Sequence, residues 1–275
     1  MKKSESGLGL TVIGLLLAVL SFFPVYFSLI SAFKSNGEIM RDPVALPTGL
    51  RLDNFVYLWQ HTRYPAAFLR SSFLTLTSIV LIILVIPIAA YILERKKVRF
   101  SGLIYIYFIA GMMIPFQAYM IPLFRQLKVL GLFGNMAGPI VIYVAGSIPF
   151  GTLLYASFIK GIPKEVEEAA VIDGCNSFQI LFRILLPLSK PALFSAAIFD
   201  FIWQWNDFFN PLIYISSVAK YPLALGLRID LDVGATVKWD QIMAMSVVTM
   251  VPPILIFFFA QKYFVEGIAT TGLKG

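Results

Sequence analysis

The chain has 275 residues, of which 59% are hydrophobic and only 13% charged, and its formal net charge is +7. An ordinary soluble domain is about 45–50% apolar and about 25% charged, and a water-soluble fold of this size cannot hide so much apolar surface. A disordered chain, a disulfide scaffold and a soluble enzyme are therefore poor interpretations, and the composition indicates a polytopic membrane protein.

Six apolar runs are long enough to cross the membrane, since a hydrocarbon core about 30 Å thick takes about 20 residues of helix. We predict an all-α protein with six transmembrane helices, at about residues 8–33, 71–93, 102–124, 137–159, 191–215 and 241–261. The first run follows Lys2 and Lys3, as the core of a signal peptide does, but it is too long and lacks a small-residue cleavage site. We therefore expect it to be a retained span.

Individual residues predict kinks, breaks and turns within and between these spans. Pro87 predicts a kink in the second span, and Pro115 and Pro122 predict breaks in the third. Residues 53–59 begin with a residue type that caps helices and predict a short interfacial helix. Residues 125–136 are expected to form a short turn.

Basic residues predict which side of the membrane the loops face. Four of the six residues at 94–99 are Lys or Arg, and two lysines precede the first span. Because cytoplasmic loops carry an excess of Lys and Arg, we expect both termini and the loops at 94–101 and 160–190 to be cytoplasmic. Contact with an anionic leaflet also explains the net charge, which gives no indication of a nucleic-acid partner.

The longest polar segment on that side, residues 160–190, carries the most specific pattern. Pro163 suits the first turn of a helix, and the three glutamates that follow complement the helix dipole. Asp173 and Gly174 predict a stop and a turn. A second helix is expected at about 177–186, broken by Pro187. By physical reasoning alone, this segment either docks on another subunit or lies along the membrane surface.

The same segment resembles the EAA motif of importer-type ABC transporter permeases, E-A-A-x3-G-x9-I-x-L-P. Every fixed position of the motif is matched, by Glu168, Ala169, Ala170, Gly174, Ile184, Leu186 and Pro187. Residues 121–123, 130–132 and 205–208 also look like parts of carbohydrate permeases, and residues 267–275 are similar to the tail of the MalG-like, maltose-type group. The chain therefore resembles the second permease of a sugar importer.

This resemblance implies an importer-type ABC permease fold over residues 1–275 and roles for particular residues. In that family the loop at 160–190 is a coupling helix seated in a cleft of the ATPase subunit, and the tail, here 263–275, reaches between the two ATPase subunits. The coupling residues would be Glu168, Ala169, Ala170, Asp173, Gly174, Ile184, Leu186 and Pro187. The tail residues would be Gly272, Leu273, Lys274 and Gly275.

The resemblance also implies a set of partners. They are a second permease that completes a heterodimer, two ATPase subunits that hold ATP and Mg, an extracytoplasmic solute-binding protein and membrane lipid. No cofactor and no metal is expected on this chain. Cys175 and His61 are each the only residue of their kind, so neither a disulfide nor a Cys or His metal cluster can be assembled.

The predicted fifth span contains polar and aromatic residues. They are Asp200, Trp203, Gln204, Asn206 and Asp207. Acids inside a span are costly and are typical of a polar pathway or a buried pair, and aromatic rings beside amides and carboxylates are typical of sugar sites. A translocation path and simple packing between helices both remain open.

The sequence contains no phosphate-binding loop, no H-E-x-x-H and no G-x-S-x-G. We therefore expect a non-enzymatic, multi-pass permease of the prokaryotic inner membrane that belongs to an ATP-driven, binding-protein-dependent importer of sugars or oligosaccharides and works by alternating access. The alternative is an ABC permease for another solute, such as glycerol phosphate. An ion channel is disfavoured because it would not need the EAA spacing, and an intramembrane enzyme because the catalytic set that it would need is missing.

Overall fold

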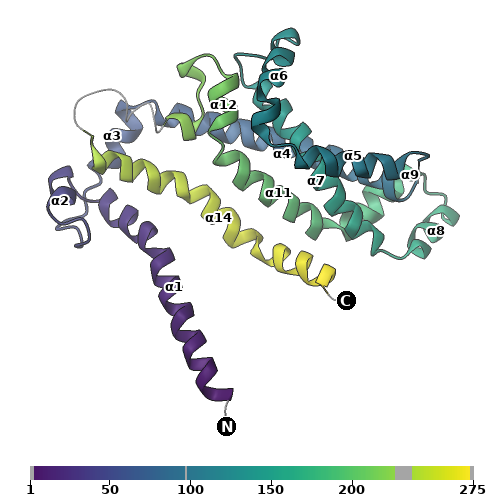
Figure 1. Ribbon diagram of the computed structural model, residues 1–275, viewed down its shortest axis with the longest axis horizontal. Helices are drawn as coiled ribbons and strands as arrows, with labels where there is room; N and C mark the ends of the chain where they lie inside the picture. The colour runs from purple at the N-terminus through teal and green to yellow at the C-terminus, as the bar shows by residue number, and fades with distance from the viewer. Residues whose placement is uncertain (1–2, 97, 227–236, 273–275) are drawn as a thin grey trace. The chain divides into compact units, whose positions relative to one another are not determined.

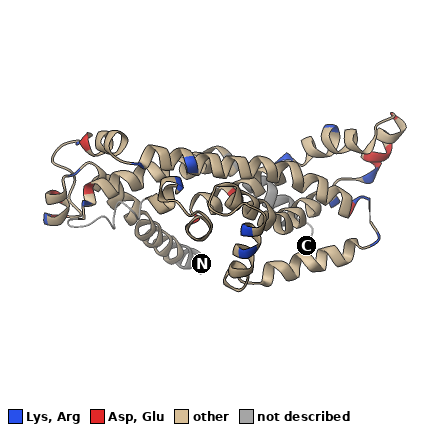
Figure 2. Ribbon diagram, turned by 90° about the horizontal axis from the view of Figure 1, so that it is seen from above, with Lys and Arg blue, Asp and Glu red and all other residues tan. Residues whose placement is uncertain are grey.

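The computed structural model describes residues 3–96, 98–226 and 237–272, and this part of the chain forms helices and connecting turns without a strand. Four helices are long and apolar enough to cross a membrane, or up to six if each of two bent pairs is one span. Figure 2 shows that long stretches of these helices carry no charged residue. The all-α, multi-span fold class is confirmed.

Contacts divide the chain into two compact units, one made of residues 1–68 and 226–252 and the other of residues 69–225 and 253–275. The first unit contains α1 (Lys3–Ala32), α2 (Asn36–Arg41) and α3 (Asp53–His61), with the start of α4 (Tyr64–Glu94) and the first part of α14 (Trp239–Gly272). Within it the Tyr64 hydroxyl donates to the Met245 carbonyl at 3.2 Å. The single permease domain expected over 1–275 stays a prediction.

The short helices of the first unit show how local signals act. α2 starts with a reciprocal capping box between Ser35 and Glu38, a pattern that the sequence contains at the spacing such boxes require. α3 includes the predicted interfacial helix, but Leu52 is its N-cap and Asp53 lies in its first turn. The capping role expected for Asp53 is therefore wrong, and the helix itself is confirmed.

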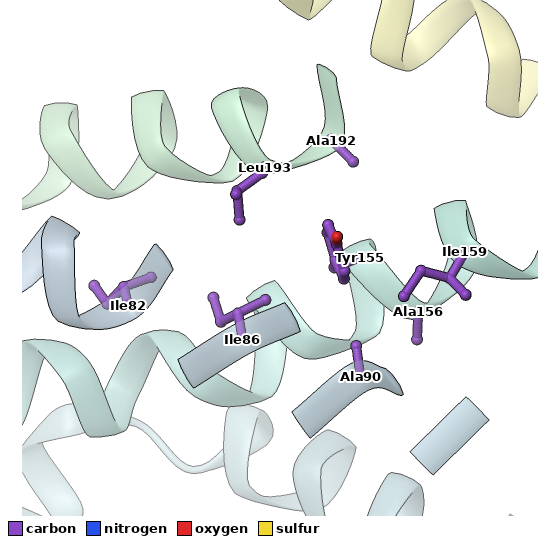
Figure 3. Packing of buried hydrophobic residues seen from close by; sticks show 8 residues of the cluster. All are labelled: Ile82, Ile86, Ala90, Tyr155, Ala156, Ile159, Ala192 and Leu193. Atoms are coloured by element: carbon purple, nitrogen blue, oxygen red, sulfur yellow. The ribbon is translucent and has the colours of Figure 1, made fainter. Parts of the chain in front are cut away.

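The second unit contains most of α4 together with the helices that follow it in the chain as far as residue 225 (Figure 1). Its other helices are α5 (Ser101–Met113), α6 (Phe116–Val129), α7 (Ala137–Lys160), α11 (Lys190–Trp205) and α12 (Phe209–Tyr214). Buried side chains of α4, α7 and α11 form its core: Ile82, Ile86, Ala90, Tyr155, Ala156, Ile159, Ala192 and Leu193 (Figure 3). A Cβ at Gly151 of α7 would lie 2.0 Å from Cδ1 of Ile86, so glycine permits the close approach of α7 to α4.

Prolines act differently from one another in the predicted third span. α5 and α6 meet at 104°, because Ile114 is extended (φ −78°, ψ 119°) as a residue before proline tends to be. Pro122 instead lies inside α6, which continues to Val129. The break expected at Pro122 and the turn expected from residue 125 are therefore wrong, since an interior proline removes only one backbone hydrogen bond of a membrane helix.

Two further segments differ from the expected spans. The fifth span, expected at 191–215, is divided into α11 and α12, with turn residues between Trp205 and Phe209. α14 is helical from Trp239 to Gly272 and therefore continues through most of the expected tail. The predicted tail residues Leu273, Lys274 and Gly275 lie outside the described residues.

Candidate functional site

The EAA segment, residues 160–190, follows α7 directly. Its first helix, α8 (Lys164–Ile172), begins after Pro163, whose backbone is at φ −57° and ψ 139°. Glu165 and Glu167 lie in the first turn, where negative charge is favoured by the helix dipole. The expected helix is confirmed, with proline one residue outside it. Figure 1 shows α8 and α9 at one end of the second unit, and Figure 2 shows the acidic stretch there in red.

A glycine turn closes α8. Asp173 is the C-cap, and Gly174 has φ +83°, a conformation that a residue without a Cβ adopts at little cost. The amide of Gly174 donates to the carbonyl of Val171 at 3.0 Å and that of Cys175 to the carbonyl of Ala170 at 2.9 Å. The expected stop and turn are therefore confirmed, and the turn requires the backbone angle that glycine supplies.

The second helical run extends farther than expected. It consists of α9 (Ser177–Gln179), the π-helix η1 (Ile180–Leu185) and α10 (Leu186–Leu188), and α11 follows at an angle of 76°. The break predicted at Pro187 lies two residues before the observed one, because the helical run includes Pro187 and ends at Leu188. The chain bends instead at Ser189, whose hydroxyl donates to the carbonyl of Leu185 at 2.5 Å and lies 2.5 Å from the Tyr155 hydroxyl of α7.

The EAA segment has an inner and an outer face. On the inner face Ala170, Ile180, Leu181 and Leu185 form one buried cluster with Tyr91 of α4. Among the predicted coupling residues, Glu168, Ala169, Asp173, Gly174 and Pro187 are exposed, and Ile184 and Leu186 are half-buried. Ala170 is 5% exposed. The small side chain of Ala170 lets α8 approach its own chain, and the coupling roles of both alanines stay predictions.

Sequence reasoning missed Arg95, which it treated only as part of a positively charged loop. Arg95 follows the last residue of α4, and its Nε lies 2.7 Å from Oε1 of Glu167 in α8. Its Nη2 donates to the carbonyls of Ile159 and Ile162, both at 2.7 Å. A buried basic residue and its acidic partner 72 positions later leave no local signal in a single sequence, because neither periodicity nor spacing relates them.

The predicted acids of the fifth span both face α7. Asp200 accepts from the Ser147 hydroxyl at 2.5 Å, and Asp207 accepts from the Tyr143 hydroxyl at 2.7 Å. Tyr143 and Ser147 are four residues apart and therefore lie on one face of α7. We name these four residues the polar seam. Both acids therefore bond to the same helix, α7.

The other candidate path residues are placed differently. Gln204 is 6% exposed, and its amide has no hydrogen-bond partner in the described part of the chain. Asn206 donates to the Ile202 carbonyl of its own helix at 2.8 Å, and Trp203 is 77% exposed. Asp207 also accepts from the amide of Phe209 at 3.0 Å and thereby helps to start α12. A translocation path through these residues stays a prediction.

Known proteins that resemble this chain do so over most of its length. The family described as "Binding-protein-dependent transport system inner membrane component" matches residues 82–270. A probable permease for starch degradation products from Thermoanaerobacterium thermosulfurigenes, AmyC, is 33% identical over 96% of each chain. The diacetylchitobiose permease NgcG of Streptomyces coelicolor is 32% identical over 90% of this chain and 82% of its own. The arabinooligosaccharide permease AraQ of Halalkalibacterium halodurans is 32% identical over 94% and 93%.

Solved structures show the same fold. A chain of a bacterial ABC transporter involved in the import of the acidic polysaccharide alginate superposes with a TM-score of 0.85 at 23% identity, covering 96% of this chain and 99% of that one. A chain of the alginate transporter in complex with its alginate-bound periplasmic protein superposes with a TM-score of 0.64 at 18% identity, covering 91% and 92%.

Proposed function

The chain belongs to the family of inner membrane components of binding-protein-dependent transport systems, and from that membership we propose that it is the transmembrane permease subunit of an ATP-driven importer of sugars or oligosaccharides. The observation that carries the proposal is the family match over residues 82–270, which includes the whole EAA segment and the polar seam. The substrate class rests on three relatives, 32–33% identical, that are named for starch products, diacetylchitobiose and arabinooligosaccharides.

The outer face of the EAA segment suits docking on a separate ATPase subunit. Glu168, Ala169 and Asp173 are exposed there, beside Ile172, which is 87% exposed. Large apolar side chains exposed next to charged ones are typical of an interaction site. The ATPase subunits would hold ATP and Mg, and nucleotide-dependent closure would favour one conformation of the permease by binding it more tightly. Alternating access follows from the switch between the two conformations.

The remaining partners follow from the same proposal. This chain would pair with a second permease, receive solute from an extracytoplasmic binding protein and have both termini in the cytoplasm. The residues from Gly272 to Gly275 would lie at the ATPase interface. Cys175, the single cysteine, is partly exposed at the turn after α8 and tests this orientation.

A membrane-impermeant maleimide should label Cys175 in inverted vesicles that lack the ATPase subunits and should leave it unlabelled in intact cells. Addition of the ATPase subunits should slow the labelling, because docking covers the turn. The Cys175→Ser variant is the matched control for background labelling. Labelling from the outside alone would contradict both the orientation and the docking role.

The transport function is tested by reconstitution of the chain with its partner permease and ATPase subunits in vesicles, with labelled solutes and the binding protein on the outside. Uptake of an oligosaccharide is expected only when ATP is enclosed and the binding protein is present. The solutes compared are maltooligosaccharides, arabinooligosaccharides, diacetylchitobiose and glycerol phosphate. Uptake of glycerol phosphate alone would overturn the sugar assignment, and ATP hydrolysis by the isolated chain would overturn the permease assignment.

A further inference from the structure

Arg95 joins three parts of the second unit at one point. It follows α4 directly, contacts Glu167 in the first half of α8, and donates to two carbonyls at the end of α7. Only 6% of the Arg95 side chain and 14% of the Glu167 side chain are exposed. No other Lys or Arg among the described residues forms an ion pair, so this cation differs from the many exposed ones in the chain.

The Arg95 guanidinium is suited to contact the end of α7 and the carboxylate of Glu167 at the same time. A guanidinium presents five donors in a fixed plane and can serve several acceptors at once, which an ammonium on a flexible stem does less well. The carbonyls of Ile159 and Ile162 belong to the last turn of α7 and the residues just after it, where helix carbonyls lack partners within the helix and the dipole is negative. Arg95 therefore donates hydrogen bonds to the end of α7 and balances the charge of the α8 carboxylate, with which it forms an ion pair but no hydrogen bond.

α8 is thus attached to the rest of the chain at two points that both involve the end of α4. Arg95 holds Glu167, and Ala170, three residues farther along α8, lies in one buried cluster with Tyr91. Positions three apart lie on the same face of a helix. Two attachments on one face fix both the position and the rotation of α8, and this directs Glu168, Ala169 and Ile172 outward.

We propose that Arg95 is a positioning residue that locks the coupling helix α8 to α4 and α7, so that a displacement of the docked ATPase moves these helices together. This inference rests on the proposed function and adds the route by which the movement enters the membrane helices. Arg95 and Glu167 need not touch the ATPase, because their side chains are turned into the chain.

The test compares Glu167→Gln, Arg95→Lys and the double variant with Arg99→Gln in the reconstituted importer. Arg99 is exposed on the same loop, and its guanidinium lies over the ring of its neighbour Phe100, which makes it a matched control. Three quantities are measured: recovery of the ATPase subunits with the permease, ATP hydrolysis, and solute taken up per ATP hydrolysed.

We expect all variants to retain the ATPase subunits and to hydrolyse ATP, whereas solute taken up per ATP falls about tenfold in both single variants and no further in the double variant. Arg99→Gln should keep the wild-type ratio. A spin label on Cys175 should show a broader distance distribution to a label on the ATPase in Glu167→Gln and an unchanged one in Arg99→Gln.

An unchanged ratio in Glu167→Gln and Arg95→Lys would overturn the inference while leaving the proposed function intact. The inference would also be overturned if solute taken up per ATP fell further in the double variant than in either single variant, since the two residues would then act separately. Failure of both single variants to assemble would also overturn it, since the pair would then be needed for folding rather than for coupling. Failure of the wild-type complex to import would instead reject the proposed function.

Discussion

One helix, α7, is held in two different ways along its length. At its end, carbonyls accept from the Arg95 guanidinium, whose charge is balanced by Glu167. In its first half, the hydroxyls of Tyr143 and Ser147 donate to two carboxylates that form no ion pair with a Lys or Arg of the described residues. The first arrangement is a buried charge pair, and the second consists of neutral donors bonded to acids.

The difference between the ion pair and the polar seam indicates which of the two contacts can change during transport. Removing one partner of a buried ion pair costs about 3–5 kcal/mol, because the other charge stays buried without compensation. A hydrogen bond to a charged group contributes about 1.5–3 kcal/mol. We therefore expect α8 to stay with α7 during transport, and α11 to shift along α7 more readily at the polar seam.

The largest effect is expected at the turn that orients the outer face of α8. Gly174→Val places a β-branched residue at φ +83°, which costs about 3 kcal/mol and should abolish uptake in the reconstituted importer. A Cβ there meets no atom within 4 Å, so the cost comes from the backbone alone. Gly174→Asn is the control, because asparagine tolerates this conformation and should retain most uptake. Equal loss in both variants would mean that the turn angle is not the cause.

A smaller effect is expected in the polar seam. Asp207→Asn weakens bonds from Tyr143, Asn210 and the amide of Phe209, and should destabilise the complex by about 2 kcal/mol. Asp200→Asn should cost less, since among the described residues only Ser147 donates a hydrogen bond to Asp200. Thermal unfolding of the purified complex measures both. A larger loss for Asp200→Asn would invert the proposed order within the seam.

A substitution at the bend before α11 should lower the stability of the complex by less. Tyr155→Phe removes a buried hydroxyl 2.5 Å from Ser189 and should cost about 1 kcal/mol, because Ser189 keeps its bond to the Leu185 carbonyl. Tyr107→Phe, at a side chain that is 75% exposed, is the control and should leave the unfolding temperature unchanged. An equal effect of the two substitutions would exclude a specific role for the Tyr155–Ser189 contact.

The smallest effect concerns a half-buried carboxylate outside the spans. The amide of Ser35 and the hydroxyls of Thr48 and Ser35 lower the pKa of Glu38 from 4.5 to about 2. Its contribution to the stability of α2 is therefore complete above pH 4.5 and is lost as the pH falls toward about 2. Hydrogen exchange of α2, corrected for intrinsic rates, should show this loss in the wild type, and Glu38→Gln should remove the pH dependence.

Several features followed from single residues or short patterns. The apolar runs predicted membrane helices because a span must bury its backbone bonds internally, and Ile114–Pro115 predicted a break because proline restricts the residue before it. The turn at Gly174 was predicted in the same way. The EAA spacing led to the resemblance to importer-type permeases for carbohydrates, which the family match and the relatives confirm.

The helix boundaries were harder to predict. Pro122 and Pro187 looked like breaks, yet both lie in helical runs, because an interior proline removes only one backbone hydrogen bond. α14 runs on through the expected tail to Gly272. Where a helix ends depends on which groups donate hydrogen bonds to carbonyls left without a partner at a proline or a helix end. Those groups are supplied by neighbouring segments.

By itself the sequence determined that the chain crosses a membrane, that residues 160–190 form helices around a glycine turn, and which residues match the EAA motif, since each depends on nearest neighbours or on spacing. Tertiary structure alone decided that Ala170 faces inward on Tyr91 and that Arg95 meets Glu167. It also placed both seam acids against α7. These contacts join residues far apart in the chain, and only the packing of α4, α7 and α11 brings them within bonding distance.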